Sequence, residues 1–218
     1  MSLFNKYNFK IKDFTADSTT RPELNGIFIN GKESVATDSF IMIRVDSVRK
    51  GLSIDDYPVH PDGRKILKDF NAFILPKETA IDVLGLFKKD NSNLPIINNA
   101  VIMKSGKGQV EIGKSDLETF NSVNSRTIEG EYPKYLPLFE QQRQQKCVKI
   151  QVNARLLKKI ITFYTDFCDD GNKTLEISVP TSPDKPLGFV ATRKDTGQTA
   201  RTLLMPIKID GPDVSGRN

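Results

Sequence analysis

Residues 108–115 match the pattern of a phosphate-binding loop, GxxxxGK(S/T), letter for letter. In such a loop backbone amides surround the phosphates of a nucleotide, and the lysine and hydroxyl side chains, here Lys114 and Ser115, complete the site. The loop must run directly into a helix. The residues around Lys114 instead alternate between apolar and polar types, which is typical of strands. The context favours a hairpin turn at Gly113–Lys114, and a P-loop nucleotide-binding protein stays open as an alternative.

The residues that commonly perform acid/base, nucleophilic or metal chemistry are few and scattered. The chain has one histidine, His60, and two cysteines, Cys147 and Cys168. A zinc site needs three or four ligands, and a triad needs a histidine near its nucleophile. Two carboxylate pairs, Asp55–Asp56 and Asp169–Asp170, lie near Gly and Pro, which favours solvated turns. We therefore expect no metal, no cofactor and no enzymatic activity.

The strongest charge feature is a run of cations without an acid between residues 143 and 159: Arg143, Lys146, Lys149, Arg155, Lys158 and Lys159. Three of them, Arg155, Lys158 and Lys159, stand at positions i, i+3 and i+4, so they share one face of a helix. Such a face can follow a phosphate backbone without recognising its sequence. A solvated surface is the alternative, and charge alone does not exclude it.

Composition fits a globular protein and permits an acidic partner without requiring one. The 218 residues are 38% hydrophobic and 27% charged, with a net charge of +5. A basic balance permits nucleic acid as a partner. Neither a membrane-length apolar run nor a signal-peptide pattern is visible. We expect a cytoplasmic protein without membrane contact.

Two segments, residues 76–89 and 152–167, have the apolar spacing of a helix. A short strand is expected before each of them, at 70–75 and 148–152, and three strands after each. The same β-α-β-β-β order thus begins at Phe70 and again at Val148. In the second helix we expect Asn153 as the N-cap and an inward apolar face made by Leu156, Leu157, Ile160, Ile161 and Tyr164.

The N-terminal part of the chain, up to His60, is predicted to be a third copy. We expect a strand at 7–14, a hairpin at Asn30–Gly31 and a strand at 40–45, with the helix reduced to a loop at 15–23. The predicted fold class is therefore α+β, with repeated β-α-β-β-β units and helices on one face of antiparallel sheets. The predicted domains are 1–142, with two units of which the first lacks its helix, 143–210 with the third unit, and a disordered tail at 211–218.

Three stretches, in order, resemble the bacterial DNA polymerase III beta sliding clamp. Residues 24–29 (LNGIFI) and 35–38 (VATD) resemble a strand of its middle domain and the following ATDGHRLA motif. Residues 128–137 (IEGEYPKYLP) resemble the junction that closes that domain, and 203–209 (LLMPIKI) resemble its chain end, VMPMRL. Residues 73–77 (FILPK) precede a helix between the first two stretches. The resemblance covers most of residues 1–209 and implies a DNA-clamp-like fold.

The resemblance also implies a function. Clamps of this family are non-enzymatic homo-oligomeric rings whose helices face duplex DNA, and they hold DNA polymerase and other replication proteins by a short peptide. The implied DNA-binding residues are Arg155, Lys158, Lys159, Lys88 and Lys89. The implied partner-peptide pocket comprises Thr37, Ser39, Phe40, Ile41, Met42, Pro133, Pro137, Leu138, Leu203, Leu204, Met205, Pro206 and Ile207.

The chain also departs from the family pattern. Where the family has Gly-His-Arg-Leu after the aspartate, this chain has residues 39–42 (SFIM), so a flexible glycine and an arginine donor are replaced. The family's first domain and half of its last domain have no counterpart. The sequence therefore leaves two hypotheses: a processivity factor that encircles DNA, and a clamp-fold protein-interaction module that does not.

Overall fold

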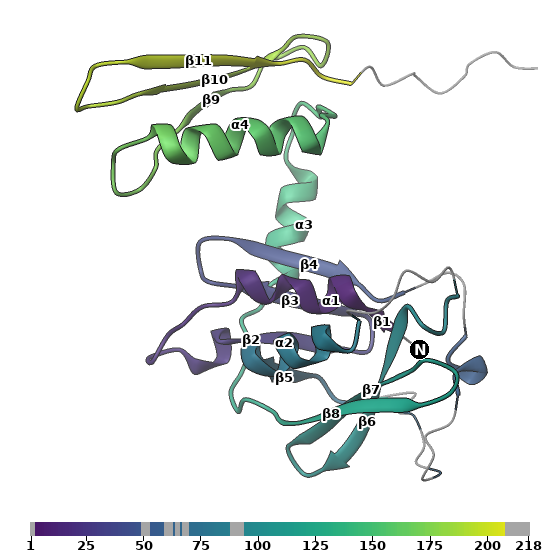
Figure 1. The fold of residues 1–218 in the computed structure, drawn as a ribbon. Helices are drawn as coiled ribbons and strands as arrows, with labels where there is room; N and C mark the ends of the chain where they lie inside the picture. Colours follow the sequence, from purple (N-terminus) through teal and green to yellow (C-terminus); the bar gives the residue numbers. More distant parts are fainter. Residues whose placement is uncertain are drawn as a thin grey trace, which may run out of the picture. The chain divides into compact units, whose positions relative to one another are not determined.

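The computed structural model describes residues 3–48, 53–58, 63, 66, 70–87 and 94–207. Internal contacts divide the chain into two compact units, Met1–Lys134 and Tyr135–Asn218, here called unit 1 and unit 2 (Figure 1). The predicted division after residue 142 falls inside helix α3 (Leu136–Gln144) and stays a prediction. The predicted tail at 211–218 lies outside the described residues.

Unit 1 contains two antiparallel four-stranded sheets. One has the order β4-β3-β2-β5 and the other β1-β6-β7-β8. The strands are β1 (Phe4–Asn5), β2 (Gly26–Asn30), β3 (Glu33–Thr37), β4 (Met42–Asp46), β5 (Phe73–Pro76), β6 (Asn99–Gly106), β7 (Gln109–Ser115) and β8 (Phe120–Arg126). Helices α1 (Lys6–Lys10) and α2 (Lys77–Gly85) contact each other, as Figure 1 shows, and short 3-10 turns lie at Ile11–Phe14, Pro22–Leu24 and Ile54–Asp56.

The two halves of unit 1 exchange their first strands. β1 immediately precedes α1 but pairs with β6, which follows α2. β5 immediately precedes α2 but pairs with β2, which follows α1. Both pairings have the same register, because the residue just before each helix lies opposite the first residue of the receiving strand: Asn5 opposite Asn99, and Pro76 opposite Gly26. Unit 1 is therefore two interlocked β-α-β-β-β halves.

The N-terminal segment corrects the prediction. Residues 7–10 belong to α1 and residues 11–14 form a 3-10 turn, so this segment is not a strand. Asn5 and Asn8 form a capping box, in which Tyr7 N–H donates to Asn5 Oδ1 and Asn5 N–H donates to Asn8 Oδ1, both at 3.0 Å. The Asn8 amide also donates to the carbonyls of Val45 and Asp46 in β4, which ties α1 to the sheet. The first half thus has a short helix, and the prediction that its helix is lost was wrong.

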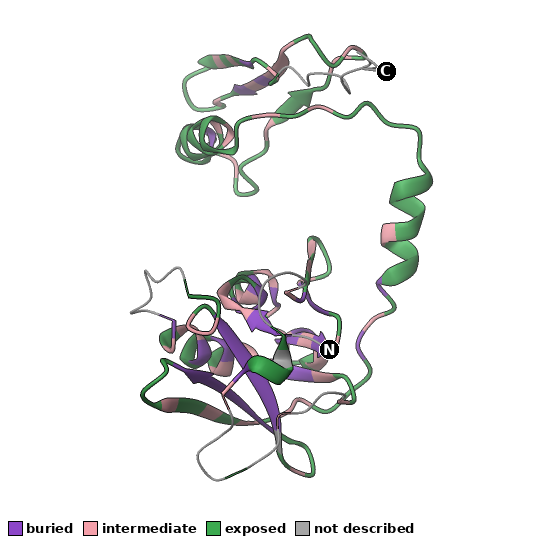
Figure 2. Cartoon of the chain, turned by 90° about the vertical axis from the view of Figure 1, so that its right-hand side faces the viewer, coloured by how far each residue is buried: buried purple, intermediate pink, exposed green. Residues whose placement is uncertain are grey.

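Unit 2 is smaller and has a single sheet. Helix α4 (Ala154–Phe167) packs on a three-stranded antiparallel sheet of order β11-β10-β9, made by β9 (Glu176–Ser178), β10 (Leu187–Thr192) and β11 (Thr199–Leu204). Its core consists of five buried residues, Tyr164, Cys168, Phe189, Ala191 and Leu204. Figure 2 shows buried segments throughout the sheets of unit 1, whereas α3 and α4 are mostly exposed.

The predicted repeat is confirmed for the helix and the three strands that follow it. α2 begins at Lys77 and α4 at Ala154, and β6 begins at Asn99 and β9 at Glu176. The next two strands begin at positions 109 and 120 in unit 1 and at 187 and 199 in unit 2, so the elements of unit 2 follow those of unit 1 at a nearly constant offset. The predicted hairpin at Asn30–Gly31 is also confirmed as the β2–β3 turn.

Two predictions for unit 2 were wrong. Residues 148–152 have no regular strand. Leu156 and Ile161 were expected to face inward but are 46% and 42% exposed. A single helix lies over the three strands, so only the central stripe of α4 is covered and its flanks stay open to solvent. Helix α3 was not predicted, although Pro137 in its first turn is a typical start signal.

Candidate nucleic-acid interface and partner pocket

Helix α4 is fixed at its start and along one side. The Asn153 side chain accepts the N–H groups of Arg155 at 2.9 Å and Leu156 at 3.4 Å, as the N-cap prediction expected. Tyr164 is buried, and its hydroxyl donates to the Phe189 carbonyl of β10 at 2.8 Å. These contacts determine which face of α4 points away from its sheet.

That outer face carries the three cations expected to contact DNA. Arg155, Lys158 and Lys159 are all exposed, and none of them forms an ion pair within the described part of the chain. They lie in the first two turns, where the helix dipole adds positive potential, so the N-terminal half of α4 favours anions. The other two predicted DNA-binding residues, Lys88 and Lys89, lie outside the described residues.

The unit 1 residues of the predicted pocket lie at the turn between β3 and β4. The buried Thr37 hydroxyl donates to the Ile41 carbonyl at 2.7 Å and accepts the Ser39 N–H at 3.1 Å. Phe40 stands at the tip and is 95% exposed, and Ile41 is 48% exposed. Met42, at the start of β4, is half-buried. The turn thus presents apolar side chains to solvent on a hydrogen-bonded support.

Ser39 stands where the family has glycine, and it nevertheless has the backbone conformation that favours glycine. Its φ is 83°, in the left-handed region. Besides the Thr37 contact, its hydroxyl accepts a hydrogen bond from Arg21 at 3.2 Å. Ser39 thus adopts a left-handed backbone conformation that is held by hydrogen bonds to Thr37 and Arg21.

Asp38 is a turn residue that the set of predicted site residues did not include. Its carboxylate accepts the N–H groups of Ile41 and Phe40, both at 2.8 Å, and these bonds lower its pKa. The signal was present in the sequence, because Asp38 ends the ATD motif. Its role here is to hold Phe40 and Ile41 in place.

The remaining pocket residues lie in other segments. Pro133 is half-buried next to Tyr132, whose ring stacks on Phe28 with centroids 4.9 Å apart. Pro137 and Leu138 are exposed in α3. At the end of β11, Leu204 is buried and Pro206 half-buried, whereas the alternating residues Leu203, Met205 and Ile207 are 70%, 64% and 49% exposed. The predicted pocket draws on both units, and its assembly stays a prediction.

Comparison of the structure with solved proteins decides the fold. The DNA polymerase III subunit beta of Borrelia burgdorferi aligns with 92% of this chain at a TM-score of 0.60 and 13% identity. The beta sliding clamp of C. crescentus aligns with 94% at 0.58 and 14%, and the Helicobacter pylori beta clamp with 96% at 0.58 and 15%. This chain has the fold of a bacterial sliding clamp.

The comparisons by sequence found no relative of this chain. No model of a protein family matches the sequence, and no curated protein matches it. The alignments cover 44%, 50% and 50% of the three solved clamps, so this chain spans about half of their length. The mixed α+β architecture predicted from the repeat and from the resemblance is thereby confirmed.

Within the clamp fold, the phosphate-loop pattern has a structural role. Residues 109–115 form strand β7, which is followed by a turn and β8 and not by a helix. Gly113 and Lys114 lie inside the strand, so the predicted hairpin turn was also wrong. A Cβ on Gly113 would lie 2.3 Å from ring atoms of Phe120, so glycine is needed here for cross-strand packing. Lys114 is buried, with Nζ 5.5 Å from the Phe87 ring centroid, so residues 108–115 do not form a phosphate-binding loop in this structure.

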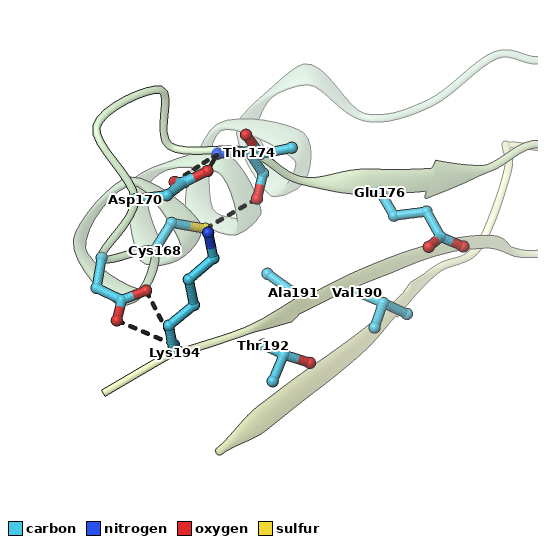
Figure 3. Close-up of a pocket in the computed structure, with 9 residues that line it drawn as sticks. Cys168, Asp170, Thr174, Glu176, Val190, Ala191, Thr192 and Lys194 are labelled. Carbon is cyan, nitrogen blue, oxygen red and sulfur yellow. Dashed lines mark hydrogen bonds between the residues drawn. The ribbon is translucent and has the colours of Figure 1, made fainter. Parts of the chain in front are cut away.

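The carboxylate pair after α4 stabilises turns. Asp169 accepts the N–H groups of Asp195 at 3.0 Å and Lys194 at 2.9 Å, and Asp170 accepts that of Thr174 at 2.9 Å. Hydrogen bonds to these groups lower the pKa of both carboxylates, so both stay ionised near neutral pH. Together with the neighbouring Cys168 they line a cavity of about 390 Å³ beside β10 (Figure 3). The geometry is that of a hydrogen-bonded turn.

The described residues contain neither a cluster of metal ligands nor a membrane-spanning helix. Across residues 3–48, 53–58, 63, 66, 70–87 and 94–207, no three His, Cys, Asp or Glu side chains are grouped to bind a metal ion. No helix in the same residues is both long and apolar enough to span a membrane.

Proposed function

We propose that this chain is a non-enzymatic, sliding-clamp-like processivity factor that binds duplex DNA without sequence preference. The observation that carries the proposal is the exposed cationic face of α4 in a clamp fold. Arg155, Lys158 and Lys159 form no described ion pair, and a helix face of this kind can contact phosphates along a duplex. Lys88 and Lys89, which the resemblance also implies as DNA-binding residues, lie outside the described residues. Weak, diffuse contact suits a protein that slides.

The proposal is tested by charge reversal. Arg155/Lys158/Lys159→Glu should weaken binding to duplex DNA and reduce the slope of log K against log salt by about 0.9 for each lost phosphate contact. The control variant is Lys107/Lys134/Lys185→Glu, which makes the same change in net charge at other exposed positions. Equal losses in both variants would mean that only net charge matters, and an unchanged slope in the first would remove α4 from the interface.

A second assay separates encirclement from simple binding. The chain is loaded on nicked circular DNA, and its retention is compared with that on the same DNA after linearisation. Retention on circles with loss from linear ends supports a closed ring. Equal behaviour on both would favour the alternative, a clamp-fold protein-interaction module. That alternative is supported by the exposed apolar side chains of Phe40 and Leu203.

We also propose that replication proteins dock through a short peptide at the predicted pocket. In unit 2 the exposed apolar side chains of Leu203 and Met205 offer contact area to a peptide, and Met205 has the flexible side chain typical of adaptable sites. In unit 1 Phe40 is exposed as well. Met205→Ala should weaken binding of a polymerase-derived peptide several-fold while the fold is unchanged, because Met205 is 64% exposed. The matched control is Leu117→Ala, an exposed apolar residue of unit 1 away from the pocket. Unchanged affinity for Met205→Ala would place the pocket elsewhere.

A further inference from the structure

Within the described residues, unit 2 repeats one half of unit 1, and no second half is seen there. In unit 1 the edge of β6 is occupied by β1, a strand from the other half. The corresponding strand of unit 2 is β9, and its sheet has only three strands, with β9 at the edge. Within the described residues, no strand occupies the outer edge of β9. Its three residues are all exposed.

Unit 2 also holds a segment in the position of the exchanged strand. In unit 1 the Ile74 carbonyl of β5 accepts the N–H of Ile128 at 2.9 Å, just after β8. In unit 2 the Gln151 carbonyl accepts the N–H of Ile207 at 2.8 Å, just after β11. These contacts are equivalent, because Ile74 and Gln151 stand at the same position relative to the first residue of the helix that follows, Lys77 in α2 and Ala154 in α4. Residues 150–153 therefore occupy the place of β5, and they overlap the segment 148–152 that was predicted to be a strand.

The difference lies on the other side of this segment. β5 pairs with β2 of the other half, but residues 148–152 pair with no strand in the part of the chain that the structure describes. Their sequence, VKIQV, alternates as a strand does, and Val148 is 41% exposed. Unit 2 thus has both parts of the strand exchange, a donor segment and an acceptor edge, and each of them is open.

We propose that a second copy of this chain completes unit 2 by reciprocal strand exchange. Residues 148–152 of each copy add to the β9 edge of the other, which makes two four-stranded sheets and a pair of α4 helices, as in unit 1. The register follows from the two exchanges in unit 1. Asn153 of one copy lies opposite Glu176 of the other, Val152 opposite Ile177, and Gln151 opposite Ser178.

The exposed apolar residues of unit 2 support this occupant. The pair in unit 1 that corresponds to Val152 and Ile177 is Leu75 and Ile27, and both are fully buried. Ile177 is 49% exposed in the single copy. Helix α4 likewise has open apolar flanks, with Phe163 51% exposed. A second half would cover these side chains, as the two halves of unit 1 cover each other.

The charges on α4 also suit a second copy of itself. Arg155, Lys158 and Lys159 lie in its N-terminal half and Asp166 in its last turn, which opposes the preference of the helix dipole at both ends. A second α4 packed antiparallel about a two-fold axis brings Asp166 of each copy towards the cationic half of the other. This association involves unit 2 alone and does not require DNA.

The first test is the mass of the full chain in solution without DNA, measured by sedimentation velocity over a range of concentrations. We expect a concentration-dependent dimer. Ile177→Lys should shift the midpoint of dimer formation at least tenfold higher, because it places a charge in the exchanged pair. The control Ile81→Lys changes a residue of equal exposure, 49%, on α2 of unit 1 and should leave the midpoint unchanged. A monomer at every concentration would overturn the proposal and point to a different protein as the second half.

The second test addresses the register directly. In a Cys147→Ser background, Gln151→Cys with Ser178→Cys should give a disulfide-linked dimer on a non-reducing gel, because opposed residues have Cα atoms about 4.5–5.5 Å apart. The control is Gln151→Cys with Ile177→Cys, whose side chains would point to opposite faces of the sheet. Equal cross-linking of both pairs, or of neither, would overturn the proposed exchange. Neither result would bear on DNA binding by α4.

Discussion

Units 1 and 2 are built from the same repeated half but differ in how much of it is covered. In unit 1, α1 and α2 contact each other, and apolar residues of both helices, such as Phe9 of α1 and Val83 of α2, are fully buried. In unit 2, the equivalent helix α4 stands alone and leaves Leu156, Ile161 and Phe163 half exposed. In unit 2 a helix and the three strands after it are present without a paired half in the described residues, and the flanks of the helix are exposed; in unit 1 the paired half covers them.

The largest effect on this difference between the units is expected from a substitution in the core of unit 1. Phe9 is fully buried and its ring centroid lies 6.2 Å from that of Phe87. Phe9→Ala should reduce the free energy of unfolding of unit 1 by about 3–5 kcal/mol, because a large buried side chain leaves a cavity. Hydrogen exchange measured by mass spectrometry should show faster exchange in β2–β8 and unchanged exchange in α4.

The matched control for Phe9 lies on the same helix. Tyr7 is 56% exposed, and Tyr7→Ala should cost well under half as much as Phe9→Ala. If both substitutions had equal effects, α1 would contribute to unit 1 through its helical structure alone and not through the contact of Phe9 with the core.

A smaller effect is expected in unit 2, at the residue that anchors α4 to its sheet. Tyr164→Phe removes the buried hydroxyl that donates to the Phe189 carbonyl at 2.8 Å, and should cost about 1–3 kcal/mol. Exchange of the α4 amides should rise while unit 1 is unaffected. The control Tyr7→Phe removes an exposed hydroxyl and should be neutral. A neutral Tyr164→Phe would mean that packing alone sets the rotation of α4.

Sequence patterns predicted the parts of both units in which one period continues over several residues. The apolar spacing of residues 152–167, together with Asn153 as the N-cap, predicted α4 and the exposure of its three cations. The Asn30–Gly31 pair predicted a hairpin that the structure contains. The repeat itself was visible, because each helix is followed by three short strands at nearly the same offsets.

The sequence failed where a contact between distant residues decides the structure. Residues 7, 9 and 11 alternate like a strand, but Asn8 bonds to β4 and Asn5 caps a helix of only five residues. Gly113 resembles a turn residue, but it is glycine because Phe120 packs over it. Residues 148–152 have a strand pattern, but the strand that would pair with them is absent from the described part of their own unit. The predicted partner pocket lists residues of both units, and no local sequence pattern tests whether they form one site.

The smallest expected difference between the units is their response to acid. Hydrogen bonds lower the pKa of four described carboxylates in unit 2, Asp169, Asp170, Asp184 and Asp195, and of two in unit 1, Asp38 and Asp116. For Asp195 the hydrogen bond from Arg193 lowers the pKa to about 2. A group whose pKa is lower in the folded state stabilises the fold fully above its unfolded pKa of 3.8, and this contribution is lost as the pH falls towards 2. Unit 2 should therefore begin to open at a higher pH than unit 1 during acid titration.

The Asp195 contribution can be isolated by substitution. Asp195→Asn should slightly lower the free energy of unfolding of unit 2 at pH 6, because the charged contact with Arg193 is gone. For the same reason, the free energy of unfolding should depend less on pH between 4 and 2. Asp13→Asn is the control, because Asp13 is an exposed acid of unit 1 that also contacts a cation, Lys12. Hydrogen exchange of residues 187–204 at several pH values measures the effect. A pH dependence unchanged by Asp195→Asn would show that the turn bonds of Asp169 and Asp170, and not the Asp195–Arg193 pair, make unit 2 sensitive to acid.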